Sequence, residues 1–285
     1  MSVAPTTPSS RPAAPAAYVL GHADLELERL ERQGQSLRGL THDVLVRAGI
    51  GPGMRVLDFG AGAGDVSLAL AQLVGPTGRV IAVDRADEAA ARAVARFAAL
   101  GVERVDVHIG DEDTALALAG AGYDAVVGRL VLLHQRDPEA TLTRLLAGLR
   151  PGGVAVFHEI EIDAGCWASP ALPLLARAFG WITDAFAHGG MPGDISARLA
   201  RGFDRAGLRD VRIMREGRIE AGPTSGAYEF MARTVRTLFP LIERLGLATA
   251  ADVDIDTLEA RLRDEAVTAG ARFIPAHFTA AWARR

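Results

Sequence analysis

The sequence contains one cysteine, Cys166, which excludes an intrachain disulfide framework and any zinc site built from several cysteines. Aromatic residues make up only 6% of the chain, and no apolar run reaches the roughly 18 residues that a membrane-spanning helix requires. Residues 1–17 lack a basic segment followed by an apolar core, so they do not match a secretory signal peptide. These absences predict a cytoplasmic protein that does not enter a membrane.

A concentration of charge of one sign is also lacking. The 31 basic and 35 acidic residues are interspersed along the chain and give a net charge of -4. A protein that binds nucleic acid normally presents a basic surface to the phosphates, and no such stretch is visible. We therefore expect a small-molecule partner and no nucleic acid, and we leave a homodimer open.

What the sequence does contain is a regular alternation of strand-like and helix-like segments. The expected strands are 55–59, 80–83, 105–109, 125–127 and 154–157, separated by expected helices at 65–74, 87–100 and 137–149. Asp137 is expected to cap the last of these helices, and Pro151, Gly152 and Gly153 are expected to end it. Strands that alternate with helices at this spacing are typical of a parallel, doubly wound α/β sheet. Further helices are expected at 194–206, 228–247 and 255–267, and further strands at 211–214 and 276–282.

Four regions follow from this pattern. Residues 1–17 read as a disordered tail, 18–50 as N-terminal helices that fold over the site, and 51–160 as the ligand-binding core. Residues 161–285 are expected to complete the sheet and to add a helical cap through insertions. The aromatic-rich segment 164–192 reads as irregular, although as a group its aromatic residues favour an apolar pocket.

A glycine-rich loop joins the first strand to the next helix. Alternating glycines permit a sharp turn and let a ligand lie against bare backbone at a helix N-terminus. In an open α/β sheet, ligands bind beyond the carboxyl ends of the strands near the point where the strand order reverses. The candidate ligand-binding residues here are Asp58, Gly60, Ala61, Gly62 and Gly64.

Acidic side chains also stand at the ends of the next two strands. Asp84 ends the second strand, about 20 residues beyond the loop, where an acidic residue usually binds a ribose diol. Gly110, Asp111 and Glu112 follow the third strand, and this polar turn is placed to meet the edge of an adenine.

The spacing of the loop discriminates between nucleotide ligands. In a dinucleotide-binding fingerprint the third glycine position would fall on Asp65 or Ser67, and neither residue suits close contact with a pyrophosphate. The Lys-Ser/Thr signature of a phosphate-binding loop is absent as well. The carboxylates of Asp58 and Asp65 would repel a pyrophosphate but suit a ligand that carries an ammonium and a sulfonium group.

With these motifs in order, Met54 to Glu159 resembles the class I S-adenosylmethionine-dependent methyltransferases. The similarity is to the small-molecule branch around the ubiquinone/menaquinone-biosynthesis methyltransferases. It rests on VLDFGAGAGD, VIAVD, HIGDED and YDAVVGRLVLLHQRDPEATLTRLLAGLRPGGVAVFHE.

The resemblance implies a Rossmann-like sheet of seven strands with the last strand antiparallel, and S-adenosylmethionine as the cofactor. It also implies that the backbone of Gly60–Gly64 holds the methionine part and that Asp84 binds the ribose hydroxyls. Arg85 would then pack near the adenine, and the turn of residues 110–112 would bind the adenine amino group.

Other polar residues near the site are open candidates. Arg129 ends the fourth strand and would either position the cofactor's carboxylate or pair with a carboxylate such as Asp58. His134 is the candidate general base, because an imidazole titrates near neutral pH, and the alternative is a histidine packed at a helix start. Gln33 is a candidate for a contact to the methionine end.

Three polar residues at the end of the fifth strand are harder to place. One of them is expected to contact substrate, or all three form a solvated turn; they are His158, Glu159 and Glu161. No metal site is predicted, because the clustered carboxylates of a catechol-type site are missing where Arg129 stands.

The sequence therefore predicts a methyltransferase that acts on a small metabolite, by O- or N-methylation in secondary metabolism. The alternatives are a nicotinamide-dependent oxidoreductase, since its fold class overlaps, and a non-catalytic cofactor-binding protein of the same fold. A cap that runs a reaction other than methylation on a retained cofactor site also stays open.

Overall fold

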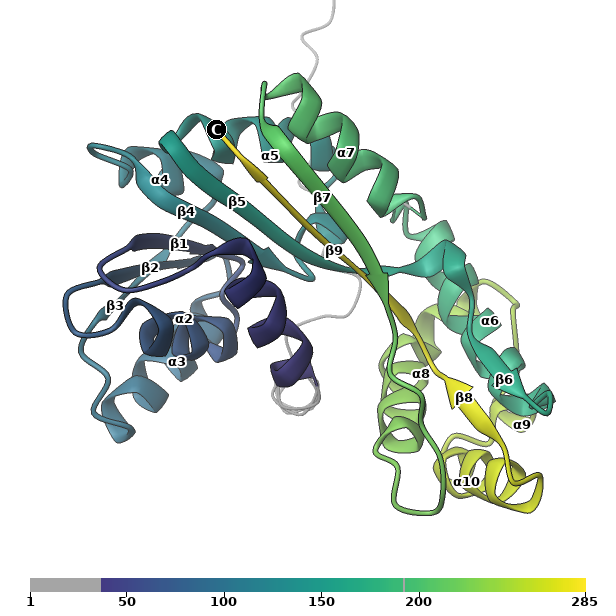
Figure 1. Cartoon of the computed structure of the whole chain (residues 1–285). Coiled ribbons are helices and arrows are strands. Elements are labelled where there is room, and N and C mark those ends of the chain that lie inside the picture. The colour runs from purple at the N-terminus through teal and green to yellow at the C-terminus, as the bar shows by residue number, and fades with distance from the viewer. Residues whose placement is uncertain (1–36, 192) are drawn as a thin grey trace, which may run out of the picture.

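The computed structural model describes residues 37–191 and 193–285, and a seven-stranded sheet runs through its centre (Figure 1). The strand order is β3-β2-β1-β4-β5-β9-β7. The first five of these strands are mutually parallel, and β9 runs antiparallel to both of its neighbours. The predicted seven-stranded sheet with an antiparallel last strand is confirmed. The strands are β1 (Arg55–Phe59), β2 (Arg79–Asp84), β3 (Val105–Ile109), β4 (Tyr123–Arg129), β5 (Leu149–Glu161), β7 (Arg209–Glu216) and β9 (His277–Arg284).

Helices cover both faces of this sheet. The helix over residues 37–48 packs with α2 (Asp65–Val74) on one face, and α3 (Asp87–Ala99) lies beside α2 in Figure 1. The other face carries α4 (Glu112–Ala117), α5 (Pro138–Ala147) and α7 (Ile195–Arg205). Because the central strands are buried on both sides, they are mostly apolar, and Val56 and Leu57 of β1 belong to opposite cores.

A third core lies in a helical cap beside the sheet (Figure 1). One part of the cap follows β5, and the other part is inserted between β7 and β9. Apolar faces of the cap helices meet around Phe273, Tyr228 and Phe186, which are all buried. The cap elements are β6 (Trp167–Ser169), α6 (Pro173–His188), α8 (Ala227–Arg244), α9 (Ala250–Val253), α10 (Leu258–Thr268) and β8 (Arg272–Ile274), with β6 and β8 paired as a second sheet.

Two sequence predictions in this part of the chain are wrong. Segment 164–192 is not irregular, since α6 occupies 16 of its residues, begins at Pro173 and buries Leu175, Phe179, Ile182 and Phe186 at helical spacing. In the sequence, the aromatic residues and Gly180 obscured the helical periodicity of this segment. In the structure, the apolar face of α6 packs into the cap core.

The second error concerns the fifth strand, which is longer than expected. Pro151, Gly152 and Gly153 were expected to end a helix and lie instead inside β5, because Gly148 already caps α5. At its other end β5 continues to Glu161, so the expected solvated turn is wrong there as well. Pairing with β9 along residues 154–161 keeps this end extended and buried.

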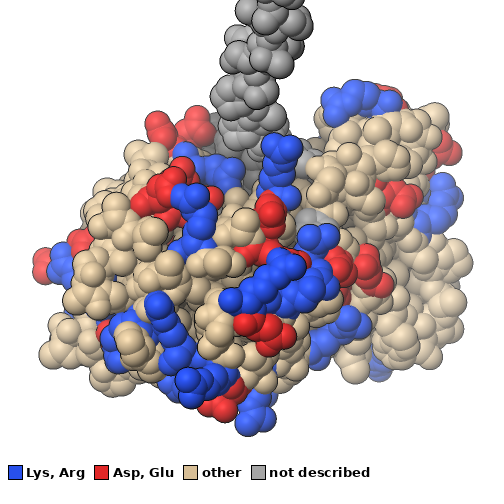
Figure 2. All heavy atoms as spheres, turned by 90° about the horizontal axis from the view of Figure 1, so that it is seen from above, with Lys and Arg blue, Asp and Glu red and all other residues tan. Residues whose placement is uncertain are grey.

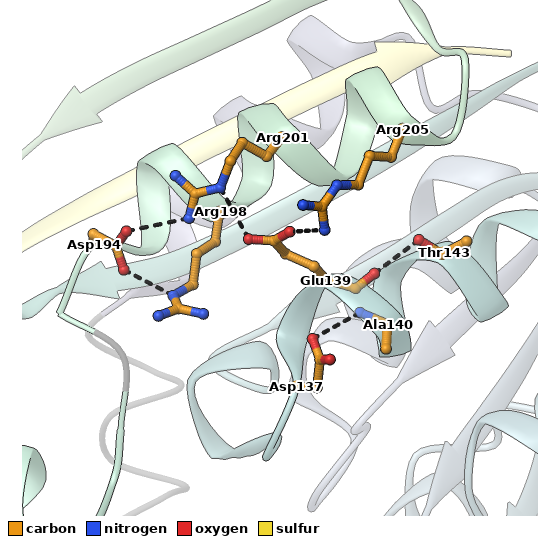
Figure 3. Close-up of polar contacts among 8 residues, drawn as sticks. All are labelled: Asp137, Glu139, Ala140, Thr143, Asp194, Arg198, Arg201 and Arg205. Carbon is orange, nitrogen blue, oxygen red and sulfur yellow. Dashed lines mark hydrogen bonds and ion pairs between the residues drawn. The ribbon is translucent and has the colours of Figure 1, made fainter.

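A polar network joins α5 to α7 (Figure 3). Asp137 caps α5 as predicted and accepts a hydrogen bond from the Ala140 amide at 3.0 Å. In the first turn of α5, the carboxylate of Glu139 is 10% exposed and pairs with Arg201, at 3.0 Å, and with Arg205. These ion pairs hold α7 against α5, the helix that follows β4 in the chain.

Charged side chains of both signs adjoin one another on the face seen from above in Figure 2, without a broad field of one sign. Among the described residues, none of the helices combines the length and the hydropathy needed to cross a lipid bilayer.

Candidate functional site

The strand order reverses between β1 and β4, and a pocket opens there at the carboxyl ends of the strands. Its volume, open mouth included, is about 1020 Å³. The β1–α2 loop, the end of β2 and the segment after β4 supply its walls. The lining residues are Phe59, Gly60, Ala61, Gly62, Ala63, Asp65, Val66, Val83, Asp84, Arg85, Ala86, Ala89, Gly110, Arg129, Leu130, Val131, His134 and Gln135.

The glycines of the β1–α2 loop have distinct structural reasons. Gly60 has a φ of 72°, and a Cβ there would lie 2.4 Å from Cγ2 of Val131. Gly64 has a φ of 83°, and its Cβ would lie 2.4 Å from Cζ of Phe97. Gly62 also has a positive φ, but no atom lies within 4 Å of its Cβ position. Gly60 and Gly64 are therefore required by packing, whereas Gly62 presents bare backbone to the pocket.

The carboxylate of Asp84 is fixed at the end of β2. Its Oδ2 accepts a hydrogen bond from the Gly62 amide at 2.8 Å, and its Oδ1 accepts one from the Ala86 amide at 2.9 Å. Each carboxylate oxygen can accept a second hydrogen bond. Asp84 is thus held in one orientation with capacity left for two hydroxyl donors.

Oppositely charged side chains pair beside the β1–α2 loop, at the start of α2. The carboxylate of Asp65, at the start of α2, lies 2.9 Å from the Arg96 guanidinium and 3.9 Å from that of Arg129. Arg96 also donates to the Ala63 carbonyl at 3.2 Å and so ties α3 to the loop. The ion pair of Arg129 is therefore with Asp65, whereas the sequence left open a contact to the cofactor's carboxylate or a pair with a carboxylate such as Asp58.

Asp58 lies beneath the loop and is not among the residues that line the pocket. It is 1% exposed, and its Oδ2 accepts a hydrogen bond from the Ser67 hydroxyl at 2.5 Å. Burial raises the pKa of Asp58 from 3.8 to about 6, although the Ser67 bond and the charge of Arg129 oppose the rise. Its visible role is to support the start of α2 from below.

The segment after β4 forms the remaining wall. Leu130 has a φ of 52°, which is uncommon for a residue other than glycine, and its amide donates to the His158 carbonyl at 2.9 Å. His134 ends the short 3-10 helix Leu132–His134 and lines the pocket. Next to it, Gln135 accepts a hydrogen bond from Arg85 at 2.8 Å, which links the end of β2 to this segment.

Glu159 holds this segment from behind. It is 0% exposed, and its Oε1 accepts hydrogen bonds from the amides of Val131, at 3.0 Å, and Leu132, at 2.9 Å. Its Oε2 has no hydrogen-bond partner within the described part of the chain. Burial raises the pKa of Glu159 from 4.5 to about 7, and the amide hydrogen bonds oppose this.

The turn after β3 contributes less to the pocket than expected. Gly110 lines it, but Asp111 accepts hydrogen bonds from the amides of Asp113 and Thr114 and so caps α4, which begins at Glu112. Gln33 lies outside the described residues, so its predicted contact stays a prediction, as does that of His134 to a substrate.

Sequence reasoning missed two kinds of residue. Apolar wall residues such as Leu130 and Val131 carry no chemical signature, and only their position after β4 could have suggested them. Arg96 acts on the site through contacts between distant segments, so no local pattern reveals it. Glu159 was a candidate for a substrate contact or a solvated turn, and its hydrogen bonds to the segment after β4 were not predicted. In residues 37–191 and 193–285, no group of three or more His, Cys, Asp or Glu could hold a metal ion.

The part of the chain that builds this pocket is similar to known proteins. Residues 50–178 match the model of a methyltransferase domain family. The chain is 38% identical over 113 residues to a protein-L-isoaspartate O-methyltransferase of Ignicoccus hospitalis, which covers 40% of this chain and 50% of that protein. It is 29% identical over 139 residues to a ubiquinone/menaquinone biosynthesis C-methyltransferase of Ectopseudomonas mendocina, covering 49% and 52%.

The chain spans about half the length of these curated relatives. Among solved structures, the YcgJ protein of Bacillus subtilis superposes with a TM-score of 0.57 at 16% identity. That likeness covers 87% of this chain and 97% of the other, so it includes the sheet beyond the matched domain. At this identity it supports the fold.

Proposed function

We propose that this chain, a member of the class I S-adenosylmethionine-dependent methyltransferases, transfers a methyl group from S-adenosylmethionine to a small molecule. The observation that carries the proposal is the carboxylate of Asp84, fixed by two backbone amides beside the bare edge of Gly62. A ribose diol can donate to this carboxylate while the rest of the nucleoside lies against the loop.

The charges at the other end of the pocket suit an amino acid. A methionine moiety carries an ammonium and a carboxylate, and Asp65 and Arg129 offer one charge of each sign. Between the two ends the wall is loop backbone and apolar side chain, which suits a thioether chain and an adenine ring. This donor set fits S-adenosylmethionine better than it fits a dinucleotide, because the carboxylates of Asp65 and Asp84 in the wall would repel a pyrophosphate.

When bound, S-adenosylmethionine supplies a methyl group that its sulfonium charge already activates. The protein must then align the acceptor with that methyl and exclude water, and such alignment is worth on the order of 7 to 11 kcal/mol. Leu130 and Val131 close the wall on the acceptor side with apolar surface. His134 lies on the same rim, where its imidazole can take a proton from an acceptor oxygen or nitrogen.

The pocket says more about the methyl acceptor than the relatives do. One relative named above is an O-methyltransferase and another a C-methyltransferase, so the similarity does not select an acceptor atom. An ionisable hydroxyl or amine is favoured here because His134 stands at the rim.

Calorimetric titration of S-adenosylhomocysteine into the full chain tests the cofactor assignment. Asp84→Ala is expected to weaken binding by one to two orders of magnitude, because charge-assisted hydrogen bonds to the ribose are lost. Asp84→Asn keeps one oxygen acceptor and should fall between the two. Asp106→Ala is the matched control, since Asp106 on β3 pairs with Arg79 on β2 and lies outside the pocket.

Equal affinity in folded Asp84→Ala and in the wild type would contradict the role of Asp84. Saturable binding of NADH in place of S-adenosylhomocysteine would instead favour the oxidoreductase alternative.

A further inference from the structure

A second cavity lies between the cap and the helix over residues 37–48. Its volume, open mouth included, is about 540 Å³. The wall is mostly apolar and comes from that helix, from the start of α8 and from the turn between β8 and β9. The lining residues are Leu37, Leu40, Arg218, Glu220, Gly226, Ala227, Phe230, Pro275, Ala276 and Phe278.

The wall formed by Phe278 is held in place by buried polar contacts. The ring of Phe278 lies edge-on against that of His158, with centroids 5.6 Å apart. His158 is 2% exposed, and its two ring nitrogens lie 3.2 Å from the Thr41 hydroxyl and 3.2 Å from the Glu216 carboxylate. Since Thr41 belongs to the helix over 37–48, these contacts join that helix, β5 and β7 around the cavity.

Contacts through Leu130 and His158 connect this cavity to the donor pocket. Leu130 lines the donor pocket and also packs against the cap core that includes Phe278. The backbone of His158 joins the two sites, because its carbonyl accepts the Leu130 amide. A reacting atom must lie about 3 to 3.5 Å from the transferred methyl, so this separate cavity suits a part of the acceptor that does not react.

The charges at the cavity compensate each other. Arg218 donates to Glu220 at 2.8 Å, and the other carboxylate oxygen of Glu220 accepts from the Ser225 hydroxyl at 2.7 Å. These two are the charged residues among those that line the cavity. The site therefore offers an ion pair for a hydrogen bond at its edge but no uncompensated charge for an ionic ligand.

We propose that this cavity binds the apolar body of the methyl acceptor, an uncharged aromatic or alkyl group, while the reacting atom reaches past Leu130 to the donor. The inference rests on the proposed methyl transfer and adds the substrate class: a molecule whose non-reacting body is lipophilic and uncharged.

Fluorescence titration with N-phenyl-1-naphthylamine, an uncharged apolar dye, tests the cavity in the full chain saturated with S-adenosylhomocysteine. The wild type is expected to bind one dye molecule per chain. Gly226→Leu adds a side chain at the cavity, and no atom within 4 Å opposes the new Cβ, so the variant should fold. We expect this variant to weaken dye binding at least tenfold.

Gly180→Leu is the matched control, because Gly180 on α6 also has open space around its Cβ position and does not line the cavity. Its dye affinity should equal that of the wild type, and S-adenosylhomocysteine should bind all three proteins alike. The sulfonated analogue 1-anilinonaphthalene-8-sulfonate should bind at least tenfold more weakly than the uncharged dye.

The proposal is overturned if the wild type binds no uncharged dye, if Gly226→Leu binds it as the wild type does, or if the sulfonated dye binds equally well. Each of these results can occur with normal S-adenosylhomocysteine binding. Loss of that binding in the wild type would instead count against the methyltransferase proposal itself.

Discussion

Replacing Glu159 by Gln isolates the effect of a buried acid on the stability of the site. The substitution keeps an oxygen that can accept the amides of Val131 and Leu132 and removes the ionisation. Its buried NH2 group adds a cost that does not depend on pH. The new amide group takes the position of Oε2, which has no hydrogen-bond partner in the described part of the chain. The shape and the backbone contacts of the wall should therefore be preserved.

The expected magnitude follows from the pKa of Glu159, which burial raises from 4.5 to about 7. One pKa unit corresponds to about 1.4 kcal/mol, so the whole rise corresponds to about 3 kcal/mol. Between pH 4.5 and 7 the unfolded chain has lost this proton and the folded chain still holds it. The carboxyl group therefore lowers the free energy of unfolding progressively as the pH rises through this window, with no further loss above it.

The assay is urea unfolding of both proteins at half-unit steps from pH 5 to pH 8. The raised pKa of Asp58 affects both proteins and cancels in the comparison. The stability of Glu159→Gln relative to the wild type should increase by about 2 to 3 kcal/mol between pH 5 and pH 7.5 and then level off. A difference that stays constant over this range would refute the reasoning, because Glu159 would then titrate alike in both states.

Three further predictions concern the site and its support. His134→Ala should lower turnover by about 100-fold or more while the affinity for S-adenosylhomocysteine stays within twofold, and a wild-type turnover number would remove the base role. Gly62→Ala places a methyl group in the pocket at a φ of 53°, so calorimetry should show at least tenfold weaker S-adenosylhomocysteine binding, with only about 1 to 2 kcal/mol lost in urea unfolding. If the variant lost more unfolding free energy than binding free energy, the assignment of Gly62 to the cofactor-binding surface would be contradicted. Glu139→Ala removes the partner of two partly exposed arginines on α7 and should cost about 1 to 2 kcal/mol of unfolding free energy without changing cofactor affinity. An unchanged urea midpoint would show that this network does not stabilise the packing of α5 on α7.

The sheet was predictable from the sequence because local patterns determine it. Runs such as those of β1 and β2 are mostly apolar on both faces, and a glycine or a capping residue marks most of the helix ends around them. Asp137 before Pro138 gave the start of α5, and the structure has both in those roles. The order of the glycine loop, Asp84 and the later motifs then placed the pocket at the carboxyl edge.

The parts that were not predictable depend on contacts between distant segments. The extension of β5 to Glu161 requires β9, which lies more than a hundred residues later in the chain. Asp65 rather than Asp58 faces Arg129 because Asp58 is turned beneath the loop toward Ser67. The hydrogen bond from the Val131 amide to Glu159 likewise joins the segment after β4 to β5, and these two segments come close only in the folded sheet.

A crystal structure of the full chain soaked with S-adenosylhomocysteine tests the central claim most directly. The account predicts both ribose hydroxyls within hydrogen-bond distance of the Asp84 carboxylate and the amino-acid end between Asp65 and Arg129. The adenine should lie on the side of Arg85 and Gly110. Electron density for the ligand at another surface, or a ribose turned away from Asp84, would contradict the account.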